Sequence, residues 1–298
     1  MTQPNLKNAR GPILVATDLT EGARPCTAWG HALGHLLDRP TVAAHVIEPR
    51  LKGLIPNRPE PDLTDARIEG IRGLLDVWYQ ETTGVTPADT EIAGGHAPSA
   101  LAQMVEGRDA SMLVMARTSK GVVQQALLGS RVQQVAQKPP CPLVVVHPES
   151  PTPAKGMHIA VATDFSEASV EAVRFAAQLA YQVEGRLSLI HCTYIPPSTH
   201  GAVDRAQEQE LAVITDICQR ELEMIRASLW SDFLDLKIDL HVLSGRPTDL
   251  LLEFDREENP SLLVVGQTGQ ASALGALLGS VPRRLLQQIV GNLCIVPQ

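Results

Sequence analysis

Short apolar runs alternate with longer amphipathic stretches along the whole chain. The β-branched runs at 12–17 and 157–163 are typical of buried parallel strands, whereas residues 167–183 repeat small apolar side chains at helical spacing. Ser166 stands directly before that segment and is a candidate N-cap, with Glu167 close to the positive end of the helix. The same criteria predict further strands at 41–47, 186–192, 91–93, 237–243, 112–115, 262–265, 143–146 and 293–296, and helices at 62–82, 204–230, 99–106, 248–257, 131–137 and 283–290.

The second half of the chain repeats the first. The segment around Asp18 reappears around Asp164, an offset of 164 − 18 = 146, and the segment around Gly129 reappears around Gly279, an offset of 279 − 129 = 150. A repeat of this length is a whole domain rather than a solenoid unit. The stretch 148–156 contains three prolines and a glycine and predicts a short, stiff linker. We therefore expect domains at 1–148 and 155–298.

Each half combines the elements of one α/β domain. Five strands that alternate with four helices predict a parallel, doubly wound sheet. The expected fold class is α/β, with two tandem Rossmann-like domains, each a five-stranded parallel sheet with helices on both faces. Ligands of such folds bind at the carboxyl ends of the strands. The apolar strands 143–146 and 293–296 could pair across the two halves.

Charge and composition exclude several classes of partner. The chain has 25 basic and 33 acidic residues, a net charge of −8, and only 3% aromatic residues, which argues against nucleic-acid binding. It has no apolar run long enough for a membrane span, and residues 1–10 lack the apolar core of a secretory signal. The five cysteines form no C-x-x-C pair, so we expect free thiols in a reducing cytoplasm.

A glycine loop in the second half is the most informative chemical feature. Gly266 and Gly269 follow a predicted strand, and Gly279-Ser280 precedes a predicted helix in which Pro282 fits only the first turn. Free backbone N–H groups and the positive end of the helix dipole would then face an anion such as phosphate. From the glycines alone, a closely packed turn is an equally good interpretation. The Walker and dinucleotide fingerprints, G-x-x-x-x-G-K-[ST] and G-x-G-x-x-G, are both absent.

Taken together, the landmarks of the second half resemble those of the ATP-binding universal stress proteins. Gly266, Gly269, Gly279 and Ser280 match the pattern G-x2-G-x9-G-[ST] of that family without a gap. The family's Val-x-x-Asp-x-Ser start, the histidine that closes the second strand and the later Gly-x-Pro are also present, at Val161, Asp164, Ser166, His191, Gly245 and Pro247. Because both halves carry such landmarks, the chain looks like a tandem universal stress protein.

The resemblance implies a role for each matching residue. Asp164 would face the ribose or the metal–phosphate region. The simpler alternative is that Asp164 serves only as an N-cap or turn residue before the first helix. Whether Mg accompanies ATP stays open, and no protein metal site or catalytic residue is expected. Adenine would be framed by Ala162, Thr163 and the backbone of Cys192, the nucleoside would lie against Val265 and Gly266, and the phosphates would be held by Thr268, Gly269, Gln270, Gly279, Ser280 and Val281.

The first half departs from this pattern. The matching positions are Ala116, Ser119, Gly129 and Ser130, so both loop glycines are lost. Arg117, Lys120 and Arg131 could attract an anion, and Gly121 could supply an altered turn. The favoured interpretation is a degenerate domain that keeps the fold and leaves one nucleotide site per chain.

Several histidines and one helix have structural rather than chemical interpretations. His31 and His35 lie four residues apart, as helical metal ligands can, but a solvated helix edge is the better expectation. His45 and His191 close matching strands and predict a shared structural role. His96 and Arg246 lie in equivalent loops, where Arg246 could contact phosphate or solvent. The apolar residues of helix 204–230, expected in the core, are Leu211, Ile214, Ile217, Cys218, Leu222 and Ile225.

The function that these features favour is binding rather than catalysis. The resemblance implies an ATP-binding, nucleotide-responsive stress regulator in the cytoplasm, with adenine nucleotide as its partner, pairing of the two domains within the chain, and homodimerisation as a further option. One alternative is an enzyme that hydrolyses ATP slowly, for which no general base is identifiable. The other is an interaction scaffold for proteins or small ligands that needs no nucleotide.

Overall fold

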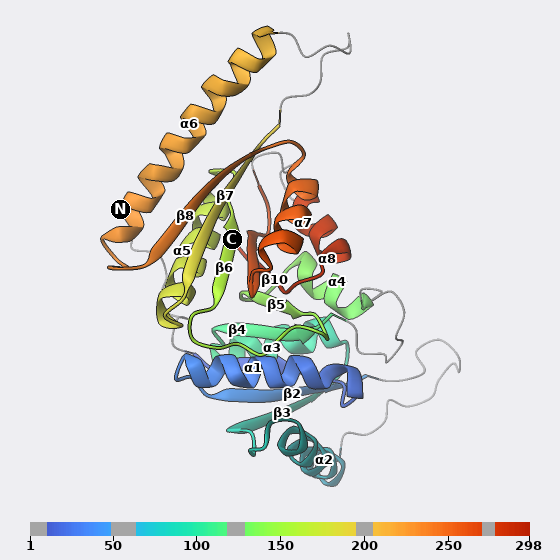
Figure 1. Cartoon of the computed structure of the whole chain (residues 1–298). Helices are drawn as coiled ribbons and strands as arrows, with labels where there is room; N and C mark the ends of the chain where they lie inside the picture. Colours follow the sequence, from blue (N-terminus) through green and yellow to red (C-terminus); the bar gives the residue numbers. More distant parts are fainter. Residues whose placement is uncertain (1–10, 49–63, 118–128, 195–204, 270–277) are drawn as a thin grey trace, which may run out of the picture. The chain divides into compact units, whose positions relative to one another are not determined.

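The chain forms two compact units, Met1–Pro153 and Ala154–Gln298 (Figure 1). The computed structural model describes residues 11–48, 64–117, 129–194, 205–269 and 278–298. In the described residues both units run through the same order of strands and helices, apart from one additional short 3₁₀ helix in the first unit.

In the first unit, the central strands are formed by β-branched and other apolar residues, which are buried except for the half-buried alanine at the end of each strand, as parallel strands covered on both faces require. The elements of this unit are β1 (Ile13–Ala16), the 3₁₀ helix η2 (Glu21–Ala23), α1 (Arg24–Leu36), β2 (Thr41–Ile47), α2 (Asp65–Thr83), β3 (Asp89–Gly94), α3 (Ala97–Arg108), β4 (Met112–Ala116), α4 (Ser130–Gln137) and β5 (Leu143–Val146).

The second unit has the same plan, with a longer helix between its second and third strands. Its elements are β6 (His158–Ala162), α5 (Glu167–Gln182), β7 (Arg186–Thr193), α6 (Arg205–Trp230), β8 (Lys237–Ser244), α7 (Pro247–Glu258), β9 (Leu262–Gly266), α8 (Ser280–Gln288) and β10 (Leu293–Val296).

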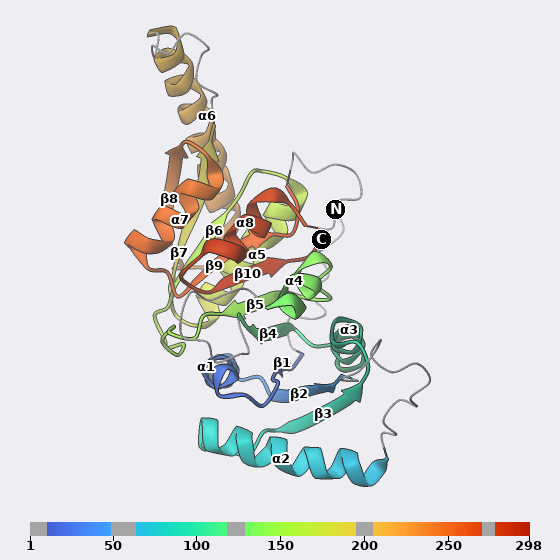
Figure 2. The ribbon, with the colours of Figure 1, turned by 90° about the vertical axis from the view of Figure 1, so that its right-hand side faces the viewer.

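The strands of each unit are parallel. Their order is β3-β2-β1-β4-β5 in the first unit and β8-β7-β6-β9-β10 in the second, so the first strand of each repeat is central. In the first unit α1 packs with α2 and α3 packs with α4, and Figures 1 and 2 show helices on both faces of each sheet. The expected α/β fold class, with two doubly wound five-stranded parallel sheets, is confirmed.

The predicted elements agree with the structure except at some ends and in one helix face. Helix α8 runs from Ser280 to Gln288, so both of its ends lie earlier than in the predicted helix 283–290. It ends at Gln288 because Ile289 already has an extended backbone. In α6, Cys218 and Leu222 are buried as expected, but Ile217 is 52% exposed, so its assignment to the core was wrong. Among the described residues, no helix combines the length and apolar character needed to cross a bilayer.

Candidate functional site

The residues predicted to bind a ligand gather at the carboxyl end of the second sheet. The chain leaves β6 toward β7 and β8 and later returns to the other side of β6 as β9 and β10. This change of direction makes the carboxyl end of the sheet at β6 and β9 the topological switch point, where open α/β sheets bind their ligands. The described candidates lie at or just after the carboxyl ends of β6, β7 and β9 or at the start of α8, and Gln270 lies outside the described residues.

Asp164 and Ser166 together begin helix α5. Asp164 Oδ1 accepts hydrogen bonds from the Ser166 amide at 3.1 Å and from the Ser166 hydroxyl at 2.5 Å. Ser166 Oγ in turn accepts from the Ser169 amide at 3.3 Å, which is N-cap geometry and confirms Ser166 as the cap. Through these bonds the Asp164 carboxylate supports the turn at the start of α5.

The backbone beside Asp164 is held in an unusual conformation. Phe165 has a φ of 63°, a left-handed value that is uncommon for a bulky residue, and its ring stacks on His191 at a centroid distance of 4.3 Å. His191 Nδ1 donates to the Thr163 carbonyl oxygen over 2.8 Å, and burial lowers the pKa of His191. Thr163 Oγ1 accepts from the Phe165 amide at 3.1 Å. These contacts fix the direction in which the chain leaves β6.

The first unit repeats this arrangement. His45 Nδ1 donates to the Thr17 carbonyl oxygen over 2.9 Å, and Leu19 has the same φ of 63° as its counterpart Phe165. The shared structural role predicted for His45 and His191 is therefore confirmed. The hydrogen bonds of the histidine, threonine and aspartate at this turn are common to both units, so they do not by themselves distinguish a binding domain from a degenerate one.

Two glycines of the loop are required by close packing. A Cβ at Gly269 would lie 2.3 Å from Asp164 Oδ2, so the loop and the carboxylate can approach only because residue 269 has no side chain. A Cβ at Gly266 would lie 3.0 Å from the Ala168 carbonyl oxygen. In the structure the missing side chain of Gly266 makes room for the first turn of α5.

The start of α8 offers backbone donors. The Gly279 amide donates to the Gln267 carbonyl oxygen at 2.9 Å, so this N–H group is already used within the loop. Pro282, in the first turn as predicted, has no N–H group. Ser280 and Val281 therefore contribute the N–H groups that lack an intrahelical acceptor, and Gly279, the N-cap, provides no side-chain cap. This end of α8 suits an anion.

The remaining candidates differ in how much of each side chain is accessible. Thr163 and Val265 are only 4% and 3% exposed, so contact with a ligand would come from their backbone atoms. Cys192 is half-buried, and burial raises the pKa of its thiol to about 12, which keeps it protonated at neutral pH. Ala162 and Thr268 are half-exposed at the crevice.

The corresponding positions of the first unit contain a different set of contacts. Arg117 is only 4% exposed, and Arg131 forms an ion pair with Glu48. Both were considered as attractants for an outside anion, but Arg117 is buried and Arg131 already has a carboxylate partner. Gly129 repeats the geometry of its counterpart, because its amide donates to the Arg117 carbonyl oxygen at 3.0 Å. Ser119, Lys120 and Gly121 lie outside the described residues.

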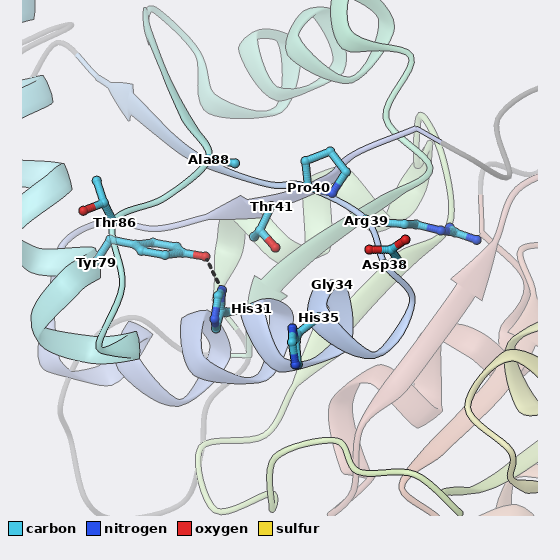
Figure 3. A pocket seen from close by; sticks show the side chains of 10 residues that line it. All are labelled: His31, Gly34, His35, Asp38, Arg39, Pro40, Thr41, Tyr79, Thr86 and Ala88. Carbon is cyan, nitrogen blue, oxygen red and sulfur yellow. Dashed lines mark hydrogen bonds between the residues drawn. The ribbon is translucent and has the colours of Figure 1, made fainter.

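A separate cavity of about 390 Å³ lies beside the amino end of β2 in the first unit (Figure 3). His31 and His35 both line it. His35 is exposed, as expected, but His31 is half-buried and its Nδ1 lies 3.1 Å from the hydroxyl of the fully buried Tyr79. The solvated helix edge therefore describes His35 and not His31. No three metal-ligating side chains converge anywhere in the described part of the chain.

Sequence reasoning missed the pairing of Glu48 with Arg131. Its partners are separated by 83 residues, and no periodic pattern connects them. The available signal was the comparison of the two repeats, because Glu48 and Arg131 align with Tyr194 and Val281. Arg246, for which phosphate and solvent contacts were both considered, is the N-cap residue of α7.

Each unit is a doubly wound parallel sheet with a topological switch point, the architecture of Rossmann-like α/β domains. The model of the universal stress protein family matches residues 10–147 and 157–297. The chain therefore belongs to the universal stress protein family, with one family domain in each half.

Known relatives agree with this assignment. A universal stress protein of Mycolicibacterium smegmatis is 25% identical over 297 residues, which cover 95% of this chain and 96% of the relative. A universal stress protein of Mycobacterium tuberculosis is 29% identical over 194 residues, 60% of this chain and 56% of that relative. The crystal structure of a universal stress protein from Archaeoglobus fulgidus has the same fold, with a TM-score of 0.63, 18% identity and coverage of 96% of this chain and 98% of that one.

Proposed function

We propose that this universal stress protein binds ATP in its second domain, with one nucleotide per chain, and acts as a nucleotide-responsive stress regulator. The observation that carries the proposal is the start of α8, where the N–H groups of Ser280 and Val281 lack an intrahelical acceptor and the Gly279 amide bonds to Gln267, directly after β9. Backbone donors of this kind bind phosphate without a basic surface. They therefore suit a chain with a net charge of −8.

The proposed contacts follow the positions around the crevice. The adenine would lie against the backbone of Ala162, Thr163 and Cys192, because the hydroxyl of Thr163 is engaged at the start of α5. Val265 and Gly266 would border the nucleoside. Asp164 would contact the ribose or a metal ion that accompanies the phosphates. The phosphate groups would be held by Thr268, Gly269, Gln270, Ser280 and Val281, with Gly279 shaping the turn.

Restriction to one nucleotide rests on differences between the two domains. The first domain has Ala116 where the second has Gly266, and Ser119 where the second has Gly269. Its Arg131, which begins α4 together with Ser130, is paired with Glu48. A nucleotide would have to displace this ion pair and also approach a loop that carries two extra side chains.

A regulatory role follows from the thermodynamics of binding. A nucleotide that binds only one conformation stabilises that conformation in proportion to its concentration relative to the dissociation constant. Residues near the crevice include the phosphate loop and the first turn of α5, so occupancy would order the surface at this end of the second domain. A partner that recognises this surface would then respond to the nucleotide level.

A pair of matched variants tests the proposal. Asp164→Ala removes the carboxylate from the proposed site, and Asp18→Ala makes the same change at the equivalent position of the first domain. We expect Asp164→Ala to weaken binding of Mg-ATP by at least about ten-fold, or about 1.4 kcal/mol, and Asp18→Ala to leave it unchanged, as measured by isothermal titration calorimetry. Asp164→Asn, which retains an acceptor for Ser166, controls for loss of the fold. Equal effects of both alanine variants would contradict the proposal.

A further inference from the structure

One carboxylate of the first domain joins the starts of two helices. Glu48 directly follows β2. Its Oε1 accepts from the Ala97 amide, the first residue of α3, at 3.2 Å. Its Oε2 accepts from Nε of Arg131 at 2.9 Å and also from Nη2 of the same guanidinium, in the first turn of α4. Three donors from two distant segments therefore converge on one side chain.

The bridge crosses the first domain's counterpart of the proposed nucleotide crevice. Glu48 follows β2 and Arg131 follows β4, and β1 lies between these two strands in the sheet. Asp18 follows β1, between the ends of those two strands. Asp18 is the counterpart of Asp164. The ion pair thus spans the place where a ligand of this domain would bind.

The second domain lacks every part of this arrangement. Glu48 aligns with Tyr194 at the offset of 194 − 48 = 146, so the carboxylate is absent. Ala97 aligns with Pro247 at the offset of 247 − 97 = 150, and proline has no N–H group to donate. Arg131 aligns with Val281 at the same offset, 281 − 131 = 150, and the valine side chain carries no charge. All three positions differ, so the second domain has no counterpart of the contacts that Glu48 makes in the first.

We propose that Glu48 is an internal ligand of the first domain: its carboxylate occupies an oxyanion position between α3 and α4 and so closes this domain to external carboxylates and phosphates. The pair remains in contact with water, because the side chains of Glu48 and Arg131 are 27% and 49% exposed. An external oxyanion can therefore reach Arg131 and the Ala97 amide once the Glu48 carboxylate is removed. The proposal concerns the first domain and does not depend on nucleotide binding by the second.

The test is chemical rescue in the full-length chain. Glu48→Ala removes the acceptor of the Ala97 amide, and we expect hydrogen exchange of that amide, followed by NMR, to become about ten-fold faster or more. Sodium acetate at about 100 mM should restore much of the protection, and sodium chloride at the same ionic strength should not. The Ala110 amide, which donates to the Val105 carbonyl oxygen at the other end of α3, should be unaffected and reports that the helix is intact.

A second variant separates an oxyanion position from an ordinary surface ion pair. In Glu48→Ala combined with Arg131→Ala, acetate should no longer protect the Ala97 amide, because the guanidinium that holds the anion is gone. Acetate should also leave the wild-type chain unchanged, because Glu48 already fills the position. The proposal is overturned if Glu48→Ala does not alter exchange at Ala97, or if acetate fails to restore protection in the single variant.

Discussion

His158 is a buried histidine whose hydrogen bonds allow only one protonation state. It begins β6 and is 8% exposed. Nδ1 accepts from Arg186 Nη2 at 2.9 Å, since a guanidinium can only donate, and Nε2 must then donate to Ser188 Oγ at 2.8 Å. Burial and, after it, the positive charge of Arg186 lower the pKa of His158. A proton on Nδ1 would remove one hydrogen bond and place two like charges in contact.

The second domain should therefore lose stability when the pH falls. Because the pKa of His158 is lower in the folded than in the unfolded chain, the unfolded chain binds more protons below about pH 6.5, and the free energy of unfolding decreases as the pH falls through this range. We expect the urea midpoint to drop between about pH 7 and about pH 5.5, and to drop less in His158→Gln than in the wild type. Burial also lowers the pKa of His241, so part of the dependence should remain in the variant.

The exposed His35 supplies the control for this measurement. His35→Gln removes an exposed imidazole from the first domain, and the drop in the urea midpoint between the two pH values should stay as in the wild type. A His158→Gln chain with the full pH dependence of the wild type would show that the buried imidazole is not responsible.

At the scale of secondary-structure elements, the two repeats differ most in how their first helices begin. Helix α5 begins directly at Glu167 and packs its first turn against Gly266. In the first domain the equivalent residues form the 3₁₀ helix η2, and α1 begins only at Arg24, where Pro25 stands in the first turn. Ala116, the counterpart of Gly266, has a side chain at the position that α5 requires to be empty.

Removal of the α5 cap should cost more than removal of its counterpart. Ser166 Oγ accepts the Ser169 amide, so Ser166→Ala should lower the free energy of unfolding by about 1 kcal/mol. Thr20 precedes η2 without a side-chain cap bond, and Thr20→Ala should cost less than about 0.5 kcal/mol. Urea unfolding of both variants measures the difference, and equal losses would contradict the assigned role of Ser166.

Local patterns predict these elements well but do not predict contacts between them. Strand and helix positions follow from periodicity, and the Ser166 cap follows from residue type at a helix start. Ile217 shows this limit within one helix. Its helical spacing relates it both to residues that face the sheet and to residues that face solvent, so the spacing alone does not decide whether Ile217 is buried. Gly266 shows the same limit for contacts between elements. The packing of α5 onto β9 explains why this position excludes a side chain, and the local sequence does not reveal that packing. The Glu48–Arg131 pair likewise depends on the folded sheet.

At the scale of the whole molecule, the chain contains two copies of one fold that differ in the residues at equivalent positions. Comparison of the repeats in the sequence already indicates that the second domain keeps the glycines of a phosphate loop and the first does not. The structure adds that the first domain has an ion pair between Glu48 and Arg131, whereas the second domain has the uncharged Val281 at the position of Arg131. The two domains of this chain therefore differ at the equivalent ends of their sheets.

The number of nucleotides bound per chain tests this asymmetry most directly. Isothermal titration calorimetry of the full-length protein with Mg-ATP should give a single binding site for each chain, and Asp164→Ala should weaken that site. Two equivalent sites per chain would contradict the distinction between the domains, and the absence of any binding would contradict the proposed nucleotide site itself.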